Sequence, residues 1–395
     1  MHKYVEKLLN GRKVEWKKIW EVTIWDKKFN NVEKFKQPKT IKYKYLLAND
    51  LKKLIVENGN VKLLTTSKTD YWTTEELAGD YIHEGEIVAI PWGGNPIVQY
   101  YKGKFVTGDN RIATSNDTNY LNNKYLYYYL WSKIDLISSF YRGSGIKHPN
   151  MASILDMDIP IPPLDVQREI VRVLDNFTEL TAELTAELTA ELSLRKKQYE
   201  YYRNKLLTFG DEVEWKELGK IAIIGTGSCN TNEAIEDGKY PFFVRSQIPR
   251  KINNYEFDET AIITAGDGVG VGKVFHFVNG KYALHQRAYR IVIKDENILL
   301  PKFLFYFFVN HFYDYIVKTS VHASVTSLRK PMFEKFKIPV PPIEKQKEIV
   351  EILDKFDTLT NSITEGLPKE ISLRQKQYEY YRDMLLNFSK GIGKK

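Results

Sequence analysis

The feature that most constrains this chain is an internal duplication. The segment that begins at Ile159, IPIPPLDVQREIVRVLD, returns 179 residues later as IPVPPIEKQKEIVEILD, with 10 of 17 positions identical. A second segment, SLRKKQYEYYRNKLLTF from Ser193, returns at the same offset as SLRQKQYEYYRDMLLNF from Ser372, with 13 of 17 identical. Two repeats at one offset indicate that the chain contains two copies of one unit. We therefore predict two similar folding units.

The duplication divides the sequence into four parts. Two variable blocks, residues 1–158 and 213–337, are each followed by one of the similar segments, residues 159–212 and 338–395. Val-Glu-Trp stands near the start of both blocks, at Val14–Trp16 and Val213–Trp215, and the sequence before Trp16 resembles the sequence before Trp215. If a pseudo-twofold axis relates the two units, the two termini should lie close together.

The similar segments are expected to form long helices. A Pro-Pro pair opens each of them and suits a helix that starts directly afterwards. From Asp165 to Phe209 there is no Gly or Pro, and apolar residues recur at helical spacing, which predicts one long helix. Gly366 and Pro368 interrupt the second segment, so we expect a kink or a break there.

Each long apolar stripe needs a partner surface. The equal spacing of the two repeats favours two long antiparallel paired helices, a coiled coil, although each helix packing on its own block is the alternative. Between the repeats lies a tandem TAEL repeat, residues 181–192. Each copy adds about 6 Å to a helix, so the repeat is either a length adjuster or plain helical filler.

Both variable blocks have a mixed α/β pattern. Each has a Gly-rich turn between β-like runs, around Trp92–Pro96 and Gly266–Lys273, and then a second turn signal at residues 102–105 and 279–282. Asn279-Gly280 in particular predicts a type I′ hairpin turn. The aromatic stretches 125–131 and 303–308 are expected to be helical and part of the core, with base stacking as the weaker alternative. The predicted fold class is α/β (α+β): two mixed α/β domains separated by the paired helices.

Composition narrows the class of protein. The chain is 43% hydrophobic and 27% charged, which is typical of a soluble globular protein. Without a long apolar run or an apolar leader we expect no membrane span and no signal peptide. The single cysteine, Cys229, cannot form an internal disulfide and fits a reducing cytoplasm.

Charge points to a polyanionic partner. The net charge is +8, and the basic excess lies mainly in the two variable blocks.

Sequence motifs of catalysis are lacking. Residues 266–273 do not match a P-loop, because Val274 stands where Ser or Thr would hold magnesium. Histidine and cysteine show no metal-ligand spacing. We predict no catalytic residue and no metal ligand.

Taken together, the alternating blocks, the duplicated I-P-x-P-P-x-x-x-Q-x-E-I segments, the duplicated KQYEYYR and the TAEL repeat closely resemble the specificity (S) subunits of type I restriction–modification systems. The resemblance extends over the whole chain. It implies that the blocks are target recognition domains that each read half of a split sequence in double-stranded DNA, while the helices set the unread gap.

The same resemblance implies partners and cofactors. Two methyltransferase (M) subunits that bind S-adenosylmethionine would methylate adenine, and restriction (R) subunits would use ATP and Mg²⁺ to translocate and cleave DNA. This chain itself would hold no cofactor and would work in the cytoplasm of a prokaryote. Two rival hypotheses remain: a stand-alone, sequence-independent DNA-binding protein, and a nucleotide-dependent enzyme that uses the 266–273 loop.

Candidate DNA-binding residues are the basic and polar side chains near turns of the two blocks, because such groups contact phosphates and base edges. For the lysines of the first block a solvated strand edge is an equal alternative. The candidates of the first block are Lys36, Lys39, Lys42, Lys44, Asn110, Arg111, Arg142, Lys147, His148 and Asn150. Those of the second block are Arg245, Gln247, Arg250, Lys251, Gln286, Arg287, His322, Ser324, Thr326, Ser327, Arg329 and Lys330.

Candidate contacts to the methyltransferase subunits lie on the duplicated helices, and we expect them to be exposed. They are Gln198, Tyr199, Tyr202 and Arg203, with their copies Gln377, Tyr378, Tyr381 and Arg382. The alternative is that the tyrosines pack the helix pair together.

Overall fold

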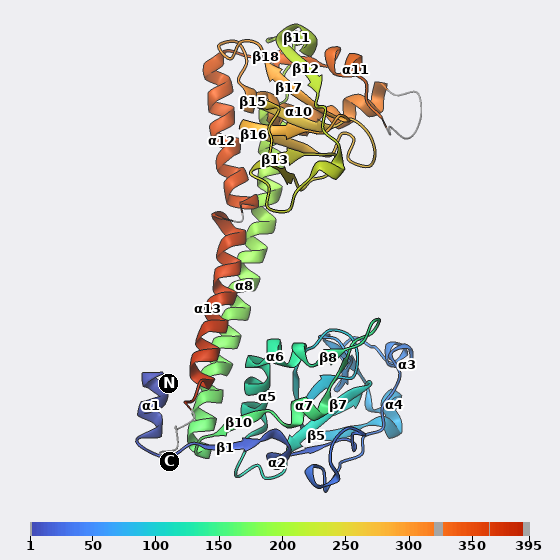
Figure 1. Ribbon diagram of the computed structural model, residues 1–395, viewed down its shortest axis with the longest axis vertical. Helices are drawn as coiled ribbons and strands as arrows, with labels where there is room; N and C mark the ends of the chain where they lie inside the picture. Colours follow the sequence, from blue (N-terminus) through green and yellow to red (C-terminus); the bar gives the residue numbers. More distant parts are fainter. Residues whose placement is uncertain (1, 320–326, 363, 390–395) are drawn as a thin grey trace. The chain divides into compact units, whose positions relative to one another are not determined.

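A computed structural model describes residues 2–319, 327–362 and 364–389 (Figure 1). The chain forms two compact units. Unit 1 comprises Met1–Ala186 and Ser372–Lys395, and unit 2 comprises Glu187–Ile371. The two units therefore share the long helices, and each is described by itself below.

Unit 1 is built on a six-stranded sheet with the order β2-β7-β5-β6-β3-β4. All neighbours are antiparallel except β3 and β6. The strands are β2 (Thr23–Trp25), β3 (Val61–Leu64), β4 (Tyr71–Thr73), β5 (His83–Pro91), β6 (Gln99–Thr107) and β7 (Asn110–Ser115). Short helices connect them: α2 (Ile19–Val22), η1 (Lys34–Lys36), α3 (Ala48–Lys53), α4 (Glu75–Ala78) and η2 (Gly79–Tyr81).

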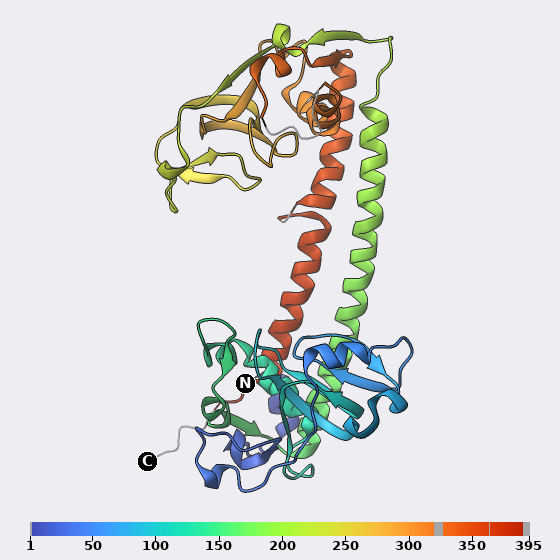
Figure 2. The ribbon, with the colours of Figure 1, turned by 90° about the vertical axis from the view of Figure 1, so that its right-hand side faces the viewer.

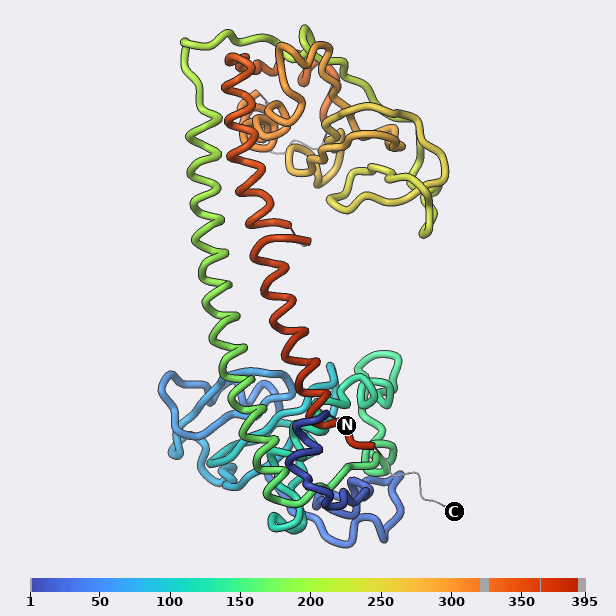
Figure 3. Tube along the Cα trace, turned by 90° about the vertical axis from the view of Figure 1, so that its left-hand side faces the viewer, coloured from blue at the N-terminus to red at the C-terminus, as the bar shows by residue number. Residues whose placement is uncertain are grey.

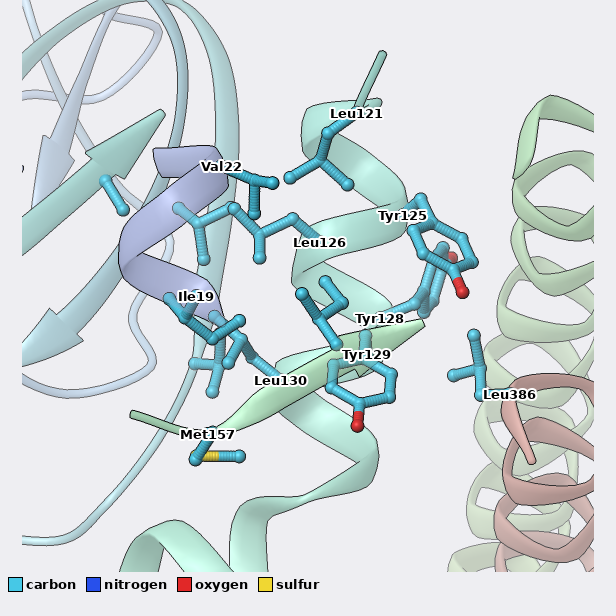
Figure 4. Packing of buried hydrophobic residues seen from close by; sticks show 14 of the residues in the cluster. Ile19, Val22, Leu121, Tyr125, Leu126, Tyr128, Tyr129, Leu130, Met157 and Leu386 are labelled. Atoms are coloured by element: carbon cyan, nitrogen blue, oxygen red, sulfur yellow. The ribbon is translucent and has the colours of Figure 1, made fainter. Parts of the chain in front are cut away.

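The aromatic helix of unit 1 is part of its core, as predicted. In α5 (Asn123–Ser132), Tyr125, Leu126 and Leu130 are completely buried. Figure 4 shows Leu126 beside Val22 of α2, while Tyr125 lies on the side of α5 that faces Leu386. Further elements complete the block: α6 (Ile134–Ser139), β8 (Tyr141–Arg142), β9 (His148–Pro149) and α7 (Met151–Leu155).

A separate two-stranded ribbon closes the block. β1 (Glu15–Lys18) pairs antiparallel with β10 (Asp158–Ile161), and Trp16 lies opposite Pro160. The Val-Glu-Trp segment and the Ile-Pro-x-Pro-Pro segment are therefore strand partners. Proline lacks a backbone N–H, which a two-stranded ribbon tolerates because each strand has a free edge. The start and the end of the block are thus held side by side.

Helix α8 (Leu164–Leu206) is one uninterrupted helix of 43 residues. In unit 1 its first part packs against the end of α13 (Gly366–Leu386), as Figures 1 and 3 show. The rings of Phe177 and Tyr381 stack with centroids 5.7 Å apart, and Thr178 Oγ1 lies 2.9 Å from the Tyr378 hydroxyl. Later residues of α8 meet earlier residues of α13, so the two helices are antiparallel, as predicted.

The described residues nearest the two ends of the chain meet in unit 1. Val5 and Leu9 of α1 (Lys3–Leu9) belong to the same hydrophobic cluster as Leu385 and Phe388. This confirms the expectation from the duplication that the termini lie close together.

Unit 2 repeats the topology of unit 1. Its sheet has the order β12-β17-β15-β16-β13-β14, again with one parallel pair, β13 with β16. The strands are β12 (Ala222–Thr226), β13 (Tyr240–Phe243), β14 (Arg250–Ile252), β15 (Phe257–Ala265), β16 (Phe275–Leu284) and β17 (Ala288–Ile293). Its helices before the second similar segment are α9 (Leu218–Ile221), η3 (Thr231–Glu233), α10 (Pro301–Thr319) and α11 (Lys330–Glu334).

The closing ribbon and the aromatic helix also recur in unit 2. β11 (Glu214–Glu217) pairs with β18 (Lys337–Val340), with Trp215 opposite Pro339. Phe303, Leu304 and Phe308 of α10 are completely buried. The aromatic stretch is therefore core in both units.

The glutamine of the duplicated motif has the same role in both units. Gln167 is completely buried; its Oε1 accepts from the Asn122 N–H, and its Nε2 donates to the carbonyls of Tyr120 and Pro162 at 2.8 Å. Gln346 does the same with Leu300, Ile298 and Pro341. One side chain thus satisfies two backbone groups at the start of each aromatic helix and one just before α8 or α12 (Ile343–Asn361), and so ties the two helices together.

In unit 2 the remainder of α8 packs against α12. Tyr199 and Tyr202 both stack on Phe356, with ring centroids 5.9 and 5.6 Å away. α12 ends at Asn361 and α13 begins at Gly366, so the predicted break is confirmed (Figure 2). Gly366 has a φ of +74°, and a Cβ there would lie 2.4 Å from the Thr358 carbonyl oxygen. Among the described residues no helix is long and apolar enough to cross a membrane.

The second turn signal of each block was interpreted wrongly. Residues 102–105 lie inside β6 and residues 279–282 inside β16, where Gly103 pairs with Gly85 and Asn279 with Thr260. The Gly-rich segments form the β5–β6 and β15–β16 connections instead. The glycines at these strand positions have positive φ, +136° at Gly103 and +106° at Gly280, so each accommodates a local distortion without ending its strand.

Candidate nucleic-acid interface

Unit 1 has a basic hollow beside the end of β5. Its volume is about 680 Å³, and its wall combines cations with aromatic rings. Lys27, Lys28, Arg111, Arg142, His148, Trp92, Tyr45 and Asp109 are among the residues that line it. A cationic hollow with aromatic walls suits a nucleic-acid partner.

Arg111 is fixed within this wall. Its guanidinium lies 4.2 Å from the Trp92 ring centroid, 2.9 Å from the Asp109 carboxylate and 3.7 Å from that of Asp26. Burial raises the pKa of Asp26, and the charge of Arg111 opposes that rise in part. Only 5% of the Arg111 side chain is exposed.

Arg111 and Asn110 correct the sequence-based expectation of an accessible polar stretch. Both are buried because they begin β7, an inner strand with a neighbour on each side. Asn110 donates from Nδ2 to the Leu64 carbonyl at 2.9 Å. The Asn110 amide nitrogen and both Nη atoms of Arg111 are therefore engaged within unit 1.

The segment between Arg142 and Asn150 has mixed fates. Arg142 and Lys147 are exposed. His148 packs on Trp92 with ring centroids 5.1 Å apart, and its Nδ1 lies 2.7 Å from the Trp92 carbonyl oxygen. Asn150 caps α7 by accepting from the Ser153 N–H at 3.4 Å. The two cations thus remain accessible, while Asn150 is used locally.

The four lysines expected to form a phosphate face also differ. Lys36 bonds to Asp156 at 2.8 Å and to Glu33 at 2.9 Å, and the bond to Asp156 is the main reason why its pKa is raised. Lys44 lies 3.9 Å from Asp80 but is well exposed. Lys39 and Lys42 are exposed. Lys36 is therefore a structural tether, and the other three keep their accessibility.

In unit 2 two arginines converge on one carboxylate. Arg245 Nη1 donates to Asp267 Oδ1 at 2.7 Å, and Arg287 Nη1 donates to Asp267 Oδ2 at 3.1 Å. Burial by itself raises the pKa of Asp267, but the two arginines outweigh it and hold that pKa below its usual value. Asp267 therefore stays ionised at neutral pH.

His285 supports this cluster. Its Nδ1 accepts from the Arg287 backbone N–H at 3.0 Å, which leaves a neutral ring with its proton on Nε2. Burial, followed by the charge of Arg245, lowers the pKa of His285 and favours that neutral form.

The other candidates of unit 2 lie on several segments. Gln247, Arg250 and Lys251 are exposed, and Gln286 donates to Asn230 Oδ1 at 2.6 Å. Ser327 forms an isolated β-bridge with Asp267. Arg329, the N-cap of α11, and Lys330, its first residue, are both exposed, and Lys330 lies 3.7 Å from Glu334. His322, Ser324 and Thr326 lie outside the described residues.

The helix candidates expected to be exposed are only partly so. Tyr378 is 5% and Arg382 6% exposed, because both pack on Trp131, at 5.5 and 5.0 Å from its ring centroid. Together with the stacks of Tyr381, Tyr199 and Tyr202 described above, this supports the alternative that these tyrosines pack the helices. Arg203 is half-buried beside the Tyr199 ring, and Gln198 and Gln377 accept from Arg195 and Arg374.

Sequence reasoning missed Asp267, Trp92 and Asp26. No sequence signal singles out Asp267 among the acidic residues of its block, and nothing in the sequence links Asp26 to Arg111. It also missed two exposed apolar pairs at equivalent positions of the duplicated helices: Leu194 with Tyr201, and Leu373 with Tyr380. Within the described ranges no group of His, Cys, Asp or Glu could hold a metal ion.

Comparison with known proteins places these units in a family. Residues 26–194 and 210–373 each match the type I restriction modification DNA specificity domain. The chain is 37% identical to the type I restriction enzyme EcoR124I/EcoR124II specificity subunit of Escherichia coli, over 98% of this chain and 97% of that one. With the E. coli EcoprrI specificity subunit it shares 35% identity over 61% of this chain and 63% of that one.

Solved structures agree on the fold. The S subunit of the type I restriction–modification system of M. genitalium superposes with a TM-score of 0.52 at 17% identity, covering 96% of this chain and 98% of that one. A chain from a study of complex assembly and conformational transition of the type I R-M system gives 0.59 at 14% identity, covering 95% and 98%. The protein belongs to the specificity subunits of type I restriction–modification systems.

Proposed function

We propose that this chain is the DNA-reading component of a type I restriction–modification complex. Unit 1 and unit 2 each recognise one half of a split DNA site, and the helices set the distance between the halves. Adenine methylation and ATP-dependent cleavage belong to partner subunits, which bind S-adenosylmethionine, ATP and Mg²⁺. The complex works in the cytoplasm of a prokaryote.

The observation that supports this proposal most directly is the pair of identical sheet topologies within one chain. Each unit carries its own set of exposed cations next to its sheet strands or in its loops, Arg142 and Lys147 in unit 1 and Arg245 and Arg287 in unit 2. Two similar but differently decorated surfaces suit two different short sequences better than one continuous sequence. Affinity would come from cations on phosphates, and discrimination from side chains at base edges.

The TAEL repeat suits the role of a ruler. It lies in the middle of α8, which is uninterrupted through all three copies. Removing one copy shortens a helix by about 6 Å, and one base step is about 3.4 Å. A shorter repeat should therefore change the gap by one or two base pairs without changing either half of the site.

A methylome tests the proposal. The chain is co-expressed with its methyltransferase subunit in a methylation-free bacterium, and modified adenines are mapped by long-read sequencing. A split motif, whose gap alone changes when Thr185–Leu188 is deleted, is the expected result. A stable complex without any motif would favour the sequence-independent DNA-binding protein instead.

We also propose where the methyltransferase subunits bind. Tyr201 and Tyr380 occupy equivalent positions of the duplication and are 60% and 62% exposed. Each lies seven residues after an exposed leucine, Leu194 or Leu373, and so shares a helix face with it. Two equivalent apolar pairs match two copies of one partner. Replacing both tyrosines by Ala should reduce co-purification, whereas unchanged co-purification would reject this surface.

A further inference from the structure

The Arg245–Asp267–Arg287 cluster of unit 2 joins three separate segments. Arg245 follows β13, Asp267 lies in the turn after β15, and Arg287 precedes β17. A guanidinium has five N–H donors, and the bond to Asp267 uses one Nη1 atom of each arginine. The arginine side chains are 40% and 62% exposed, while Asp267 is 21% exposed. The cluster therefore holds both guanidinium groups in place through the Asp267 carboxylate, while their remaining N–H donors stay exposed.

Charge makes base edges a better target for this cluster than phosphates. A carboxylate between the two cations offsets one of the two positive charges and would itself repel a phosphate. The carboxylate does, however, fix the direction in which the arginine N–H donors point. An ordered guanidinium matches the O6 and N7 acceptors of guanine with two parallel hydrogen bonds. Restricting the arginine rotamers before binding also reduces the entropy lost on binding.

The surroundings of the cluster favour the same target. Val269, two residues after Asp267, is 98% exposed, and Ile248, three residues after Arg245, is 78% exposed. Apolar side chains this exposed gain nothing from a phosphate backbone, but they can contact the methyl group of thymine in the major groove. Exposed apolar side chains next to oriented hydrogen-bond donors are the combination that proteins use to read base edges.

We propose that Asp267 is a positioning residue that holds Arg245 and Arg287 for the recognition of guanine in the half-site read by unit 2. This inference rests on the proposed function. It requires that this half-site contain at least one G·C pair.

The test compares methylomes of the full chain co-expressed with its methyltransferase subunit. The first variant, Asp267→Asn, removes the negative charge that holds the two arginines. The other two, Arg245→Lys and Arg287→Lys, keep the positive charge but lose the pair of parallel N–H donors of the guanidinium. Glu217→Gln is the matched control, because it removes the same charge from another ion pair of unit 2, that with Lys220 at 3.5 Å. Asp267→Glu serves as the conservative rescue. Co-purification and melting temperature establish that each variant folds.

The expected result is relaxed stringency at a G·C pair in one half of the motif. The preference for that pair should fall about tenfold in Asp267→Asn and in at least one Lys variant, as the loss of a bidentate contact implies. The other half, the gap and the Glu217→Gln motif should not change, and Asp267→Glu should restore stringency. An unchanged motif, a unit 2 half-site without a G·C pair, or a uniform loss of methylation at all sites would each overturn the inference. A wild type without any motif would instead refute the proposed function.

Discussion

At the residue scale, the fate of a side chain depends on neighbours that are distant in sequence. Arg111 and Arg287 look alike in the sequence, since each lies near an aspartate or a histidine after a β-like run. Arg111 is nevertheless buried against Asp26, 85 positions earlier, whereas Arg287 is exposed. Sequence could identify both as candidates, but it could not tell which remains accessible.

The motif glutamines give a stability prediction at this scale. Gln167→Ala removes the partner of one buried and two partly buried backbone groups, at a cost of about 3 kcal/mol in the free energy of unfolding. The melting temperature should fall by roughly 6–12 °C. Gln375→Ala is the control, because that side chain is exposed and bonds only to Glu379 among the described contacts. Equal melting temperatures for both variants would contradict the assigned role of Gln167.

Three packed histidines of unit 2 predict a pH dependence. Burial lowers the pKa of His276, His285 and His311 below the ordinary value of 6.5. Near pH 6.5 these histidines therefore bind protons in the unfolded chain but not in the folded chain. Their contribution to the free energy of unfolding is complete above that pH and is lost as the pH falls through it. The melting temperature should drop between pH 7.5 and 5.5, and it should drop less in His311→Gln. His2→Gln, which leaves these three rings in place, should behave like the wild type.

At the scale of elements, the sequence predicted those helices whose position depends on the spacing of apolar residues and on Gly and Pro. The uninterrupted α8, the break before α13 and the buried aromatic helices follow from spacing and from Gly and Pro. The Asn279-Gly280 signal failed because its flanking residues continue one strand ladder with β15. A turn dipeptide favours a hairpin locally, but the competing Gly-rich segment nearby already connects the two strands.

The break before α13 gives a prediction about an element. Gly366→Ala pays for a positive φ and also places a Cβ 2.4 Å from the Thr358 carbonyl oxygen. Gly11→Ala is a matched control, because Gly11 has a similar φ of +78° and open space around its Cβ position. The Gly366 variant should lose at least 1 kcal/mol more in denaturant unfolding than the Gly11 variant. Equal losses would mean that the close approach costs nothing.

At the scale of the whole molecule, the duplication predicts that a block can be exchanged as a module. Each block begins and ends in one two-stranded ribbon, β1 with β10 and β11 with β18. A junction placed within a ribbon leaves both six-stranded sheets intact. The repeat was visible in the sequence, but the ribbon that closes each block was not, because its strands are only four residues long.

This modularity is tested by exchanging residues 213–337 for the corresponding block of the E. coli relative that is 37% identical to this chain. The ribbon partners Trp215 and Pro339 stand at both junctions, and the match with that relative extends over 98% of this chain, so the new block should close its ribbon as the old one does. We expect the methylome to show one changed half-site, with the gap and the other half as before. A second exchange with its first junction inside β12 is the control. It breaks the pairing of β12 with β17 and should yield insoluble protein. A change in both halves after the first exchange would mean that the two units do not read DNA separately.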